Sequence, residues 1–300
     1  MQAKRHVAVV LAVAVLAGSH GAAGQGRGVP RGVAFNSSRD GNSEIYVMNW
    51  DGSDPFRITE NVATDIDPAI SPNGRDIIFT SNRSGNNNDI FIADITGRNP
   101  INLTNHSAND GWARWSPNGR QIVFHTNRDG GNFEIYVMND DGSFPTRITD
   151  YPGIDQFPDW SPNGQEIVFR RDMDIYTLDL GTGETRRLTE TAPLLNQMAT
   201  WSPNGKQLAF MSARHGYPSV FVMNADGSGQ TNLTPKDAGD LDTQWVSRAP
   251  SWSTTGRQIY FMSSRPGTGL DTDILIMNAD GTGLMRLTNT IGVDGSPNAR

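Results

Sequence analysis

Acidic residues recur at a fixed spacing in this 300-residue chain and are the first candidates for chemistry. Five positions before a repeated tryptophan site stands an aspartate or a small polar residue: Asp65, Asp110, Asp155, Asn196, Ser247 and Asp294. Carboxylate oxygens suit calcium. The aspartates Asp65, Asp110, Asp155 and Asp294 could therefore hold a calcium ion in a central channel, although no cofactor is required. The alternative is that they cap turns by accepting backbone N–H bonds.

Two aromatic residues predict a binding site. Trp112 and Phe157 stand three positions before Trp115 and Trp160, where the other repeats have Asp67, Met198, Ala249 and Ser296. Because the fold does not need an aromatic side chain there, we expect these two rings to form an exposed patch. With Trp245, Asp110 and Asp155 the patch would bind an extended segment that carries a Lys or Arg. The alternative is that both rings pack under neighbouring loops.

The signs of enzyme chemistry are weak. His106, His125 and His215 could form a three-histidine metal site. No "GxSxG" nucleophile motif and no phosphate-binding glycine loop is present. The chain also has no cysteine, which excludes disulfides and thiolate metal sites. The sequence therefore favours a protein without catalytic residues.

The N-terminus is typical of a secretory signal peptide. Lys4, Arg5 and His6 precede the apolar run "VAVVLAVAVLAG" (7–18), and small residues follow. The run is too short to span a bilayer core of roughly 30 Å. We expect residues 1–23 to be removed near Ala23, with cleavage at 17–19 as the second choice and an uncleaved anchor as the alternative. The mature protein would then be exported, to the periplasm or the medium, without a transmembrane segment.

Charge limits the choice of partners. The formal net charge is −7 at pH 7 and becomes −9 without Lys4 and Arg5. No basic run is present, so nucleic acid and anionic membranes are not expected partners. A monomer is expected.

Six repeats of about 45 residues organise the rest of the chain, a period typical of propeller blades. A short strand ends in Ile-Thr or Leu-Thr in each repeat, at Thr59, Thr104, Thr149, Thr189, Thr234 and Thr288. The second marker is the tryptophan site: Ile70, Trp115, Trp160, Trp201, Trp252 and Ala299. Each repeat predicts four strands, such as "FPDW", "QIVF", "EIYVMN" and "TRIT", joined by "SPNG" and "DG" turns. Apart from the signal peptide, the chain is expected to be all-β.

The two ends of the repeat array predict a closed ring. The first repeat begins at its second strand, "RGVAF", and the C-terminal "DGSPNAR" (294–300) aligns with the first strand of another repeat. The C-terminal segment should therefore supply the inner strand of blade one. The predicted organisation is signal peptide 1–23, linker 24–32 and a six-bladed β-propeller over 33–300.

Residues that recur in every blade are expected to hold the fold rather than to bind. The tryptophans of the second marker should be core wedges. An arginine closes each second strand (Arg39, Arg83, Arg128, Arg171, Arg214 and Arg265), and an acid opens most third strands (Glu44, Asp89, Glu134, Asp174 and Asp273). We interpret these two sets as ion pairs or loop clamps within a blade. Function is then expected on the face where blades differ, which carries the loops between second and third strands and the crossings between blades.

The motifs "WSPNG", "SSRDGNSEIYVMN" and "DGS" followed by "RIT" resemble the repeat of the TolB β-propeller and related WD-like propellers. The resemblance covers residues 33–300 and implies the six-bladed fold without TolB's N-terminal domain. It also implies a non-enzymatic module that binds a protein or peptide, and metal in the channel of some relatives. The alternative is a carbohydrate-active enzyme like the propeller-type oligogalacturonate lyases, or a sugar-binding module.

Overall fold

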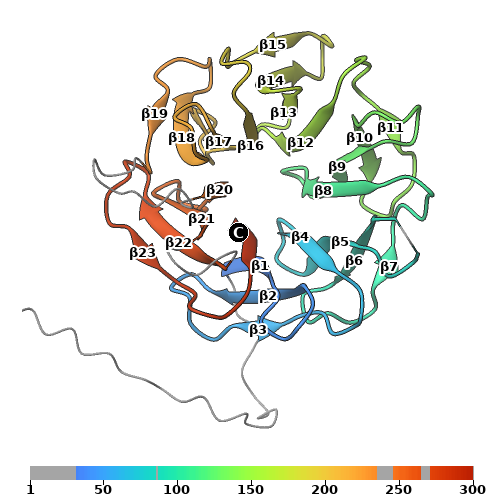
Figure 1. The fold of residues 1–300 in the computed structure, drawn as a ribbon. Coiled ribbons are helices and arrows are strands. Elements are labelled where there is room, and N and C mark those ends of the chain that lie inside the picture. The colour runs from blue at the N-terminus through green and yellow to red at the C-terminus, as the bar shows by residue number, and fades with distance from the viewer. Residues whose placement is uncertain (1–31, 86, 235–245, 265–270, 300) are drawn as a thin grey trace, which may run out of the picture.

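The computed structural model describes residues 32–85, 87–234, 246–264 and 271–299. In these residues, 24 strands form six four-stranded antiparallel sheets, which stand around a common axis as the blades of a propeller (Figure 1). The predicted fold class, all-β with six blades, is therefore confirmed. The signal peptide and most of the linker lie outside the described residues, and the first strand already begins at Gly32.

The four strands of a blade run from the channel outward. The first, inner strands are β24 (Asp294–Ala299), β4 (Asp65–Ile70), β8 (Asp110–Trp115), β12 (Asp155–Trp160), β16 (Asn196–Trp201) and β20 (Ser247–Trp252). The second strands are β1 (Gly32–Ser37), β5 (Asp76–Ser81), β9 (Gln121–Thr126), β13 (Glu166–Arg171), β17 (Gln207–Ser212) and β21 (Gln258–Ser264).

The two outer positions complete each blade. The third strands are β2 (Glu44–Asn49), β6 (Asp89–Asp94), β10 (Glu134–Asn139), β14 (Asp174–Asp179), β18 (Ser219–Asn224) and β22 (Thr272–Asn278). The fourth, outermost strands are β3 (Phe56–Arg57), β7 (Ile101–Asn102), β11 (Thr146–Arg147), β15 (Thr185–Arg187), β19 (Thr231–Asn232) and β23 (Met285–Arg286). The outermost strands are two or three residues long, which leaves little exposed edge for pairing with another chain.

The turns divide the molecule into two faces. The hairpin face carries the turns between first and second strands, such as 71–74, and those between third and fourth strands. The loop face carries the loops between second and third strands and the crossings between blades, such as 60–64. In the turn at 71–74, Gly74 has a φ of 69° and its N–H donates to the carbonyl of Ser71 at 2.9 Å. Asn73 Oδ1 accepts from the backbone N–H of Arg75 at 2.8 Å, which fixes the direction of the second strand.

The core consists of apolar side chains between neighbouring blades. Between blades one and two, for example, Ile45 and Val47 pack against Ile77, Phe79 and other residues. Each tryptophan at the end of an inner strand is 4–7% exposed. Trp115 Nε1 donates to the carbonyl of Ala69 in the preceding blade at 3.1 Å, and Trp252 Nε1 to that of Thr200 at 3.3 Å. The prediction that the tryptophans wedge the blades together is confirmed.

The C-terminal strand closes the ring. β24 pairs with β1 in the first sheet, with Val33 opposite Ala299 and Ser37 opposite Asp294. In Figure 1 the red C-terminal strand lies beside the blue start of the propeller at the centre. The predicted closure is therefore present.

Every inner strand contains a β-bulge at its third residue. These residues have φ between 45° and 56°, although none is glycine: Asp67, Trp112, Phe157, Met198, Ala249 and Ser296. The register against the second strand shifts at the same place, for example between Gln156 and Asp159. A bulge can redirect a side chain out of the normal alternation. The repeat position that holds Trp112 and Phe157 therefore has a left-handed backbone conformation in all six blades.

Candidate functional site

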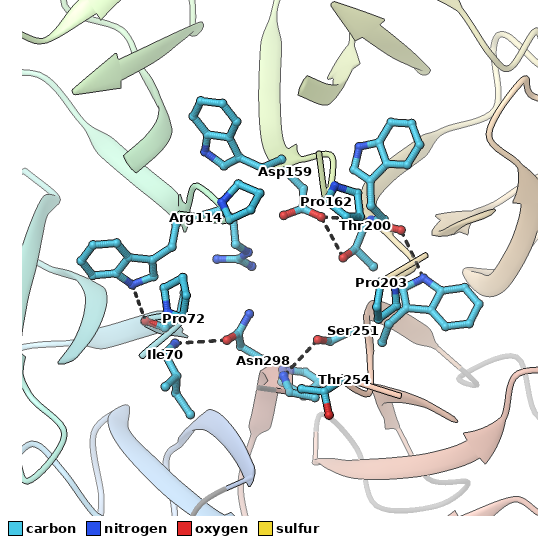
Figure 2. A pocket seen from close by; sticks show the side chains of 18 of the residues that line it. Ile70, Pro72, Arg114, Asp159, Pro162, Thr200, Pro203, Ser251, Thr254 and Asn298 are labelled. Atoms are coloured by element: carbon cyan, nitrogen blue, oxygen red, sulfur yellow. Dashed lines mark hydrogen bonds between the residues drawn. The ribbon is translucent and has the colours of Figure 1, made fainter. Parts of the chain in front are cut away.

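A cavity of about 370 Å³ lies in the central channel on the hairpin face (Figure 2). Its walls come from the ends of the inner strands and from the turns that follow them. Its apolar lining includes turn prolines and wedge tryptophans: Pro72, Pro117, Pro162, Pro203, Trp115, Trp160, Trp201 and Trp252. Ligand sites in proteins commonly have this size, with polar groups that fix the orientation of the ligand.

One position of the repeat, the residue before the end of each inner strand, supplies five polar side chains and one alanine to the cavity. These residues are Ala69, Arg114, Asp159, Thr200, Ser251 and Asn298. Three of them accept a backbone N–H from the next blade. Asn298 Oδ1 accepts from Ile70 at 3.1 Å, and Asp159 Oδ2 accepts from Trp201 at 3.0 Å. Ser251 Oγ accepts from Ala299 at 3.0 Å. These bonds tie neighbouring blades together and fix the rim of the cavity.

One charge of each sign lines the cavity. Arg114 and Asp159 come from neighbouring blades, and Figure 2 shows the guanidinium of Arg114 directed into the open space. Its Nη1 donates to the carbonyl of Ala113 at 2.8 Å, and its Cζ lies 4.6 Å from the centre of the Trp112 ring. Asp159 Oδ2 also accepts from Thr200 Oγ1 at 2.9 Å. The cavity therefore offers apolar walls with a polar pair on one side.

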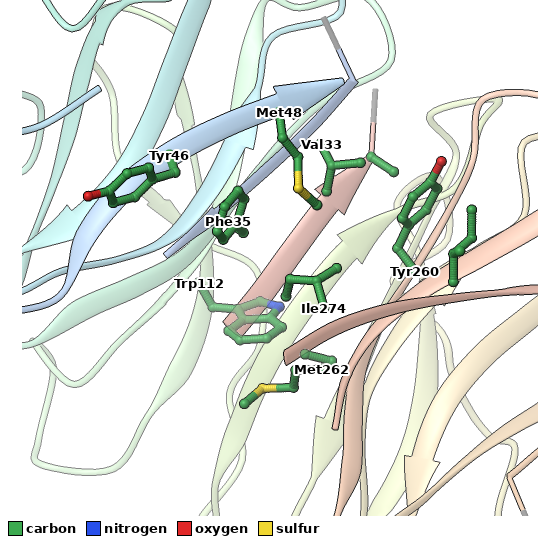
Figure 3. Packing of buried hydrophobic residues seen from close by; sticks show 11 residues of the cluster. Val33, Phe35, Tyr46, Met48, Trp112, Tyr260, Met262 and Ile274 are labelled. Atoms are coloured by element: carbon green, nitrogen blue, oxygen red, sulfur yellow. The ribbon is translucent and has the colours of Figure 1, made fainter. Parts of the chain in front are cut away.

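Trp112 lines the same cavity from within the channel. It is 6% exposed and belongs to a cluster of buried residues that includes Met262 and Ile274 (Figure 3). Its ring meets that of Phe157 edge to face, with the centroids 4.9 Å apart. The structure thus brings the two aromatic residues together, as expected, but inside the channel. Trp112 is buried and so does not contribute to an exposed patch, whereas Phe157 is partly buried.

The aspartates at the start of the inner strands are not displayed at a channel mouth either. The side chains of Asp65, Asp110, Asp155 and Asp294 are fully buried, each under an arginine at the end of the second strand of its blade or just beyond it. The pairs are Arg39–Asp294 (3.1 Å), Arg83–Asp65 (2.7 Å), Arg128–Asp110 (3.1 Å) and Arg171–Asp155 (2.7 Å). In blade five, Arg214 Nη2 donates to Asn196 Oδ1 at 3.2 Å instead. Asp110 and Asp155 therefore do not form an acidic rim beside Trp112 and Phe157.

This pairing corrects part of the predicted ion pairs. The arginine after the second strand meets the acid of the first strand, and the acid of the third strand meets an arginine of the fourth. The second set of pairs is Arg57–Glu44 (3.1 Å), Arg147–Glu134 (2.8 Å), Arg187–Asp174 (2.6 Å) and Arg286–Asp273 (3.1 Å). The pairs do lie within blades, as expected. Arg265 lies outside the described residues.

No metal site is assembled from the described residues. They contain no group of three or more His, Cys, Asp or Glu side chains that could hold a metal ion. The four aspartates of the inner strands are separately engaged by arginines, so calcium in the channel stays a prediction without a preformed ligand set. The three histidines likewise do not gather into a metal site.

His125 instead lies in the interior beside the aromatic pair. Its ring centroid is 5.0 Å from that of Phe133 and 5.6 Å from that of Phe157. Nδ1 accepts the backbone N–H of Phe157 at 3.3 Å. Burial, followed by the charges of Arg170 and Arg114, lowers the pKa of His125 to about 3. This histidine is therefore neutral at physiological pH and acts as a structural acceptor.

The site also differs in position from the expected one. The loop face, where the blades differ most, was predicted to bind the partner, whereas this cavity lies on the hairpin face. Trp245, the third predicted aromatic contact, lies outside the described residues.

In the part of the chain that the structure describes, no helix has the length and apolar character needed to cross a bilayer.

Comparison with known proteins agrees with the blade architecture. A family model described as the TolB beta propeller domain matches residues 88–174, which run from the third strand of blade two to the start of the third strand of blade four. The Tol-Pal system protein TolB of Geobacter sulfurreducens is 44% identical over 45 residues, which are 15% of this chain and 10% of that protein. The solved TolB of Acinetobacter baumannii superimposes with a TM-score of 0.77 at 23% identity, over 90% of this chain and 66% of that one.

The chain is therefore similar to the TolB beta propeller domain over residues 88–174, and its fold is that of a six-bladed propeller. The matched stretch spans about a tenth of the length of the curated relatives, so the likeness concerns the propeller. An oligogalacturonate lyase from Vibrio parahaemolyticus shares the fold with a TM-score of 0.58 and 13% identity, over 85% of this chain and 74% of that one. At that identity the likeness shows the fold alone.

Sequence reasoning missed the polar rim of the cavity in this propeller. Arg114 and Asp159 stand directly before the repeated tryptophans, in the first strand of the repeat, whose recurring residues we expected to hold the fold. The signal was available, because this position differs in every blade while its neighbours repeat. A variable position within a repeated phrase indicates a side chain that the fold does not specify.

Proposed function

We propose that this protein is an exported, non-enzymatic binding module that takes an extended protein segment into the cavity on the hairpin face. The observation that carries the proposal is the cavity itself, about 370 Å³ with tryptophan and proline walls and a polar pair, Arg114 and Asp159. Proline and tryptophan walls suit apolar side chains, and the two charges can fix the direction of a peptide.

The relatives support a protein partner. Two curated relatives are named Tol-Pal system protein TolB. A Pal protein of the same organism is therefore the first partner to test. The described residues supply no observation that favours a lyase or a sugar-binding module over a protein-binding one, and they contain no group of three or more His, Cys, Asp or Glu side chains that could hold a metal ion.

The test compares two arginine variants that remove the same charge from the same face. Arg114→Gln changes the cavity and keeps an amide that can donate to the carbonyl of Ala113. Arg120→Gln is the matched control, because Arg120 is exposed in the turn beyond Pro117 and does not line the cavity. Residues 24–300 of each variant would be titrated with purified Pal and used to capture partners from the envelope fraction.

We expect Arg114→Gln to weaken partner binding about tenfold or more, as loss of a charged hydrogen bond at an interface does. Arg120→Gln should bind as the wild type. Equal binding by all three proteins would exclude the cavity as the site. Binding to another envelope protein but not to Pal would retain the binding function and exclude a role in a Tol-Pal system.

Export is proposed from the N-terminal sequence. Expression of the whole chain with its first 23 residues, followed by N-terminal sequencing of the mature protein, tests it. Cleavage near Ala23 is the expected result, and an intact N-terminus in the cytoplasmic fraction would contradict it.

A further inference from the structure

Arg170 lies at the loop-face side of the aromatic pair and has only neutral hydrogen-bond partners in the described residues. Its Nη1 donates to Gln197 Oε1 at 3.0 Å, and its Nη2 donates to Gln156 Oε1 at 2.5 Å. The Nε atom is buried and has no hydrogen-bond partner among the described residues. The guanidinium carbon lies 5.1 Å from the centre of the Phe157 ring. This arginine is thus held in place by two amides and one ring.

The charge of Arg170 is not balanced in the way that its neighbour's charge is. Arg171 forms an ion pair with Asp155 at 2.7 Å, whereas no described carboxylate forms an ion pair with Arg170. Burial lowers the pKa of Arg170, and Asp172 opposes this through space. A guanidinium removed from water without a counter-ion is costly, so an anion that reaches it gains strong attraction.

The groups left around Arg170 are hydrogen-bond donors. Both amide oxygens of the site already accept from the guanidinium, so Gln156 and Gln197 present their NH2 groups to any further ligand. Gln197 Nε2 has one distant contact, with Met198 Sδ at 4.0 Å. Together with Nε of Arg170, these groups form a set of donors around a positive charge, which matches an acceptor-only ligand such as a carboxylate.

This donor set is separate from the cavity on the hairpin face. Arg114 covers the Trp112 ring and lines the cavity, whereas Arg170 covers the Phe157 ring and is not part of the cavity lining. The two rings are in contact with each other, and each ring carries one of the two arginines. The channel therefore has a cation on each side of its aromatic pair.

We propose that Arg170, Gln156 and Gln197 form a carboxylate-binding site on the loop-face side of the channel. The ligand supplies a planar carboxylate, either from an Asp or Glu side chain or from the C-terminus of a peptide. The charge of this ligand is opposite to that of the basic segment expected for this part of the channel.

Acetate is the direct probe. The side-chain Nε–H resonance of Arg170 would be followed by NMR during titration with sodium acetate, with sodium chloride at equal ionic strength as the salt control. We expect a saturable shift with acetate and none with chloride. The Nε–H of Arg83 is an internal control, because it already donates to Ser81 Oγ at 2.9 Å and its guanidinium is paired with Asp65. Equal shifts at both arginines, or no shift at Arg170, would overturn the proposal.

Variants separate a site from a general charge effect. Arg170→Met should weaken acetate binding at least about tenfold, measured by the stabilisation that acetate gives in thermal melts. Gln197→Glu places a carboxylate next to Arg170 from within the chain, so it should raise the Tm and abolish the effect of acetate. An acetate effect that persists in Gln197→Glu would contradict the site, and this variant stays informative if Arg170→Met folds poorly.

Two short peptides distinguish the sources of the carboxylate. One has a free C-terminus and no acidic side chain, and the other is amidated and contains a single internal Asp. A shift of the Arg170 signal by the first peptide supports a C-terminal carboxylate, and a shift by the second supports an acidic side chain. A response to acetate but to neither peptide would contradict a peptide or protein source of the carboxylate. These results are independent of Arg114→Gln, so failure here leaves the proposed function standing.

Discussion

At the scale of single residues, the third position of each inner strand decides what fills the channel. These six residues adopt the left-handed backbone conformation, which costs a residue other than glycine about 1–2 kcal/mol. Because all six blades share the conformation while their side chains differ, the fold requires the bulge and not the side chain. One blade places Trp112 there and another places Asp67, whose carboxylate accepts from Ser296 Oγ at 2.7 Å. The channel interior is thus specific to this sequence.

Replacement of Trp112 by alanine is predicted to destabilise the fold as much as replacement of a wedge tryptophan. Trp112 and Trp160 are 6% and 7% exposed, so each variant should lose about 3–5 kcal/mol of unfolding free energy. Chemical denaturation measures this. Phe144→Ala is the control, because Phe144 is 81% exposed and its loss should change stability by at most about 0.5 kcal/mol. Full stability of Trp112→Ala would favour the exposed-patch hypothesis after all.

His125 should make the protein sensitive to mild acid. Its pKa is lowered in the folded state from 6.5 to about 3. The unfolded chain therefore binds a proton more readily between these values, and stability falls as pH drops below 6.5. Between pH 7.5 and 5 the loss should reach up to about 2 kcal/mol.

The variant His125→Asn retains an oxygen acceptor for the N–H of Phe157 and does not titrate. We expect its Tm to fall less than that of the wild type between pH 7.5 and pH 5. Parallel Tm profiles for the two proteins would show that His125 is not responsible. The site is tight, since a Cβ at Gly111 would come within 3.3 Å of His125 Nε2.

At the scale of elements, the inner strand is the part of the blade that connects it to its neighbours. Side chains near its end bond to the next blade, as Asp159 does to Trp201 and Ser251 does to Ala299. β24 has this role in blade one although it comes from the other end of the sequence. It lies between β1 and the channel, and its Asn298 bonds to the backbone of Ile70 in blade two. Blade one therefore depends on β24 on both sides.

Deletion of residues 290–300 is predicted to abolish cooperative thermal unfolding. The shortened chain loses β24, its bonds to blades one, two and six, and the partner of Arg39, and it exposes the edge of β1. Differential scanning calorimetry measures this, and removal of Arg300 alone is the control that leaves β24 intact. A melting temperature within a degree or two of that of the mature protein would exclude this account of ring closure.

At the scale of the whole molecule, most of the fold was predictable from the sequence because the repeat states each local rule six times. The third strand of blade three was expected at "EIYVMN" and is β10, with the same bounds. The turns follow from "SPNG" and "DG", and the closure follows from the offset between the two ends. Repetition separates the residues that a blade needs from those that vary.

The site was less predictable, because its properties depend on contacts between blades that no single repeat encodes. Asp110 and Asp155 look like ligands in the sequence, and only the partner arginines show that they are neutralised. Trp112 looks exposed until the bulge is known. Arg170 was not singled out at all, since its strand position holds Met211 in one blade and His125 in another. The hydrophobic pattern and the turn residues predict the scaffold. The sign of the charge inside the channel depends on contacts between blades and can be seen only in the structure.

The pairing of β24 with β1 has a consequence for the order of the chain. Val33 and Ala299 are opposite each other, so the first and last strands of the propeller begin and end side by side. A short peptide link between them would turn the backbone into a circle of six similar units. The circle could then be opened at another exposed turn, such as the one at Gly183, to give a rearranged sequence with the same contacts. The contacts within and between blades therefore do not depend on where in the ring the chain begins and ends.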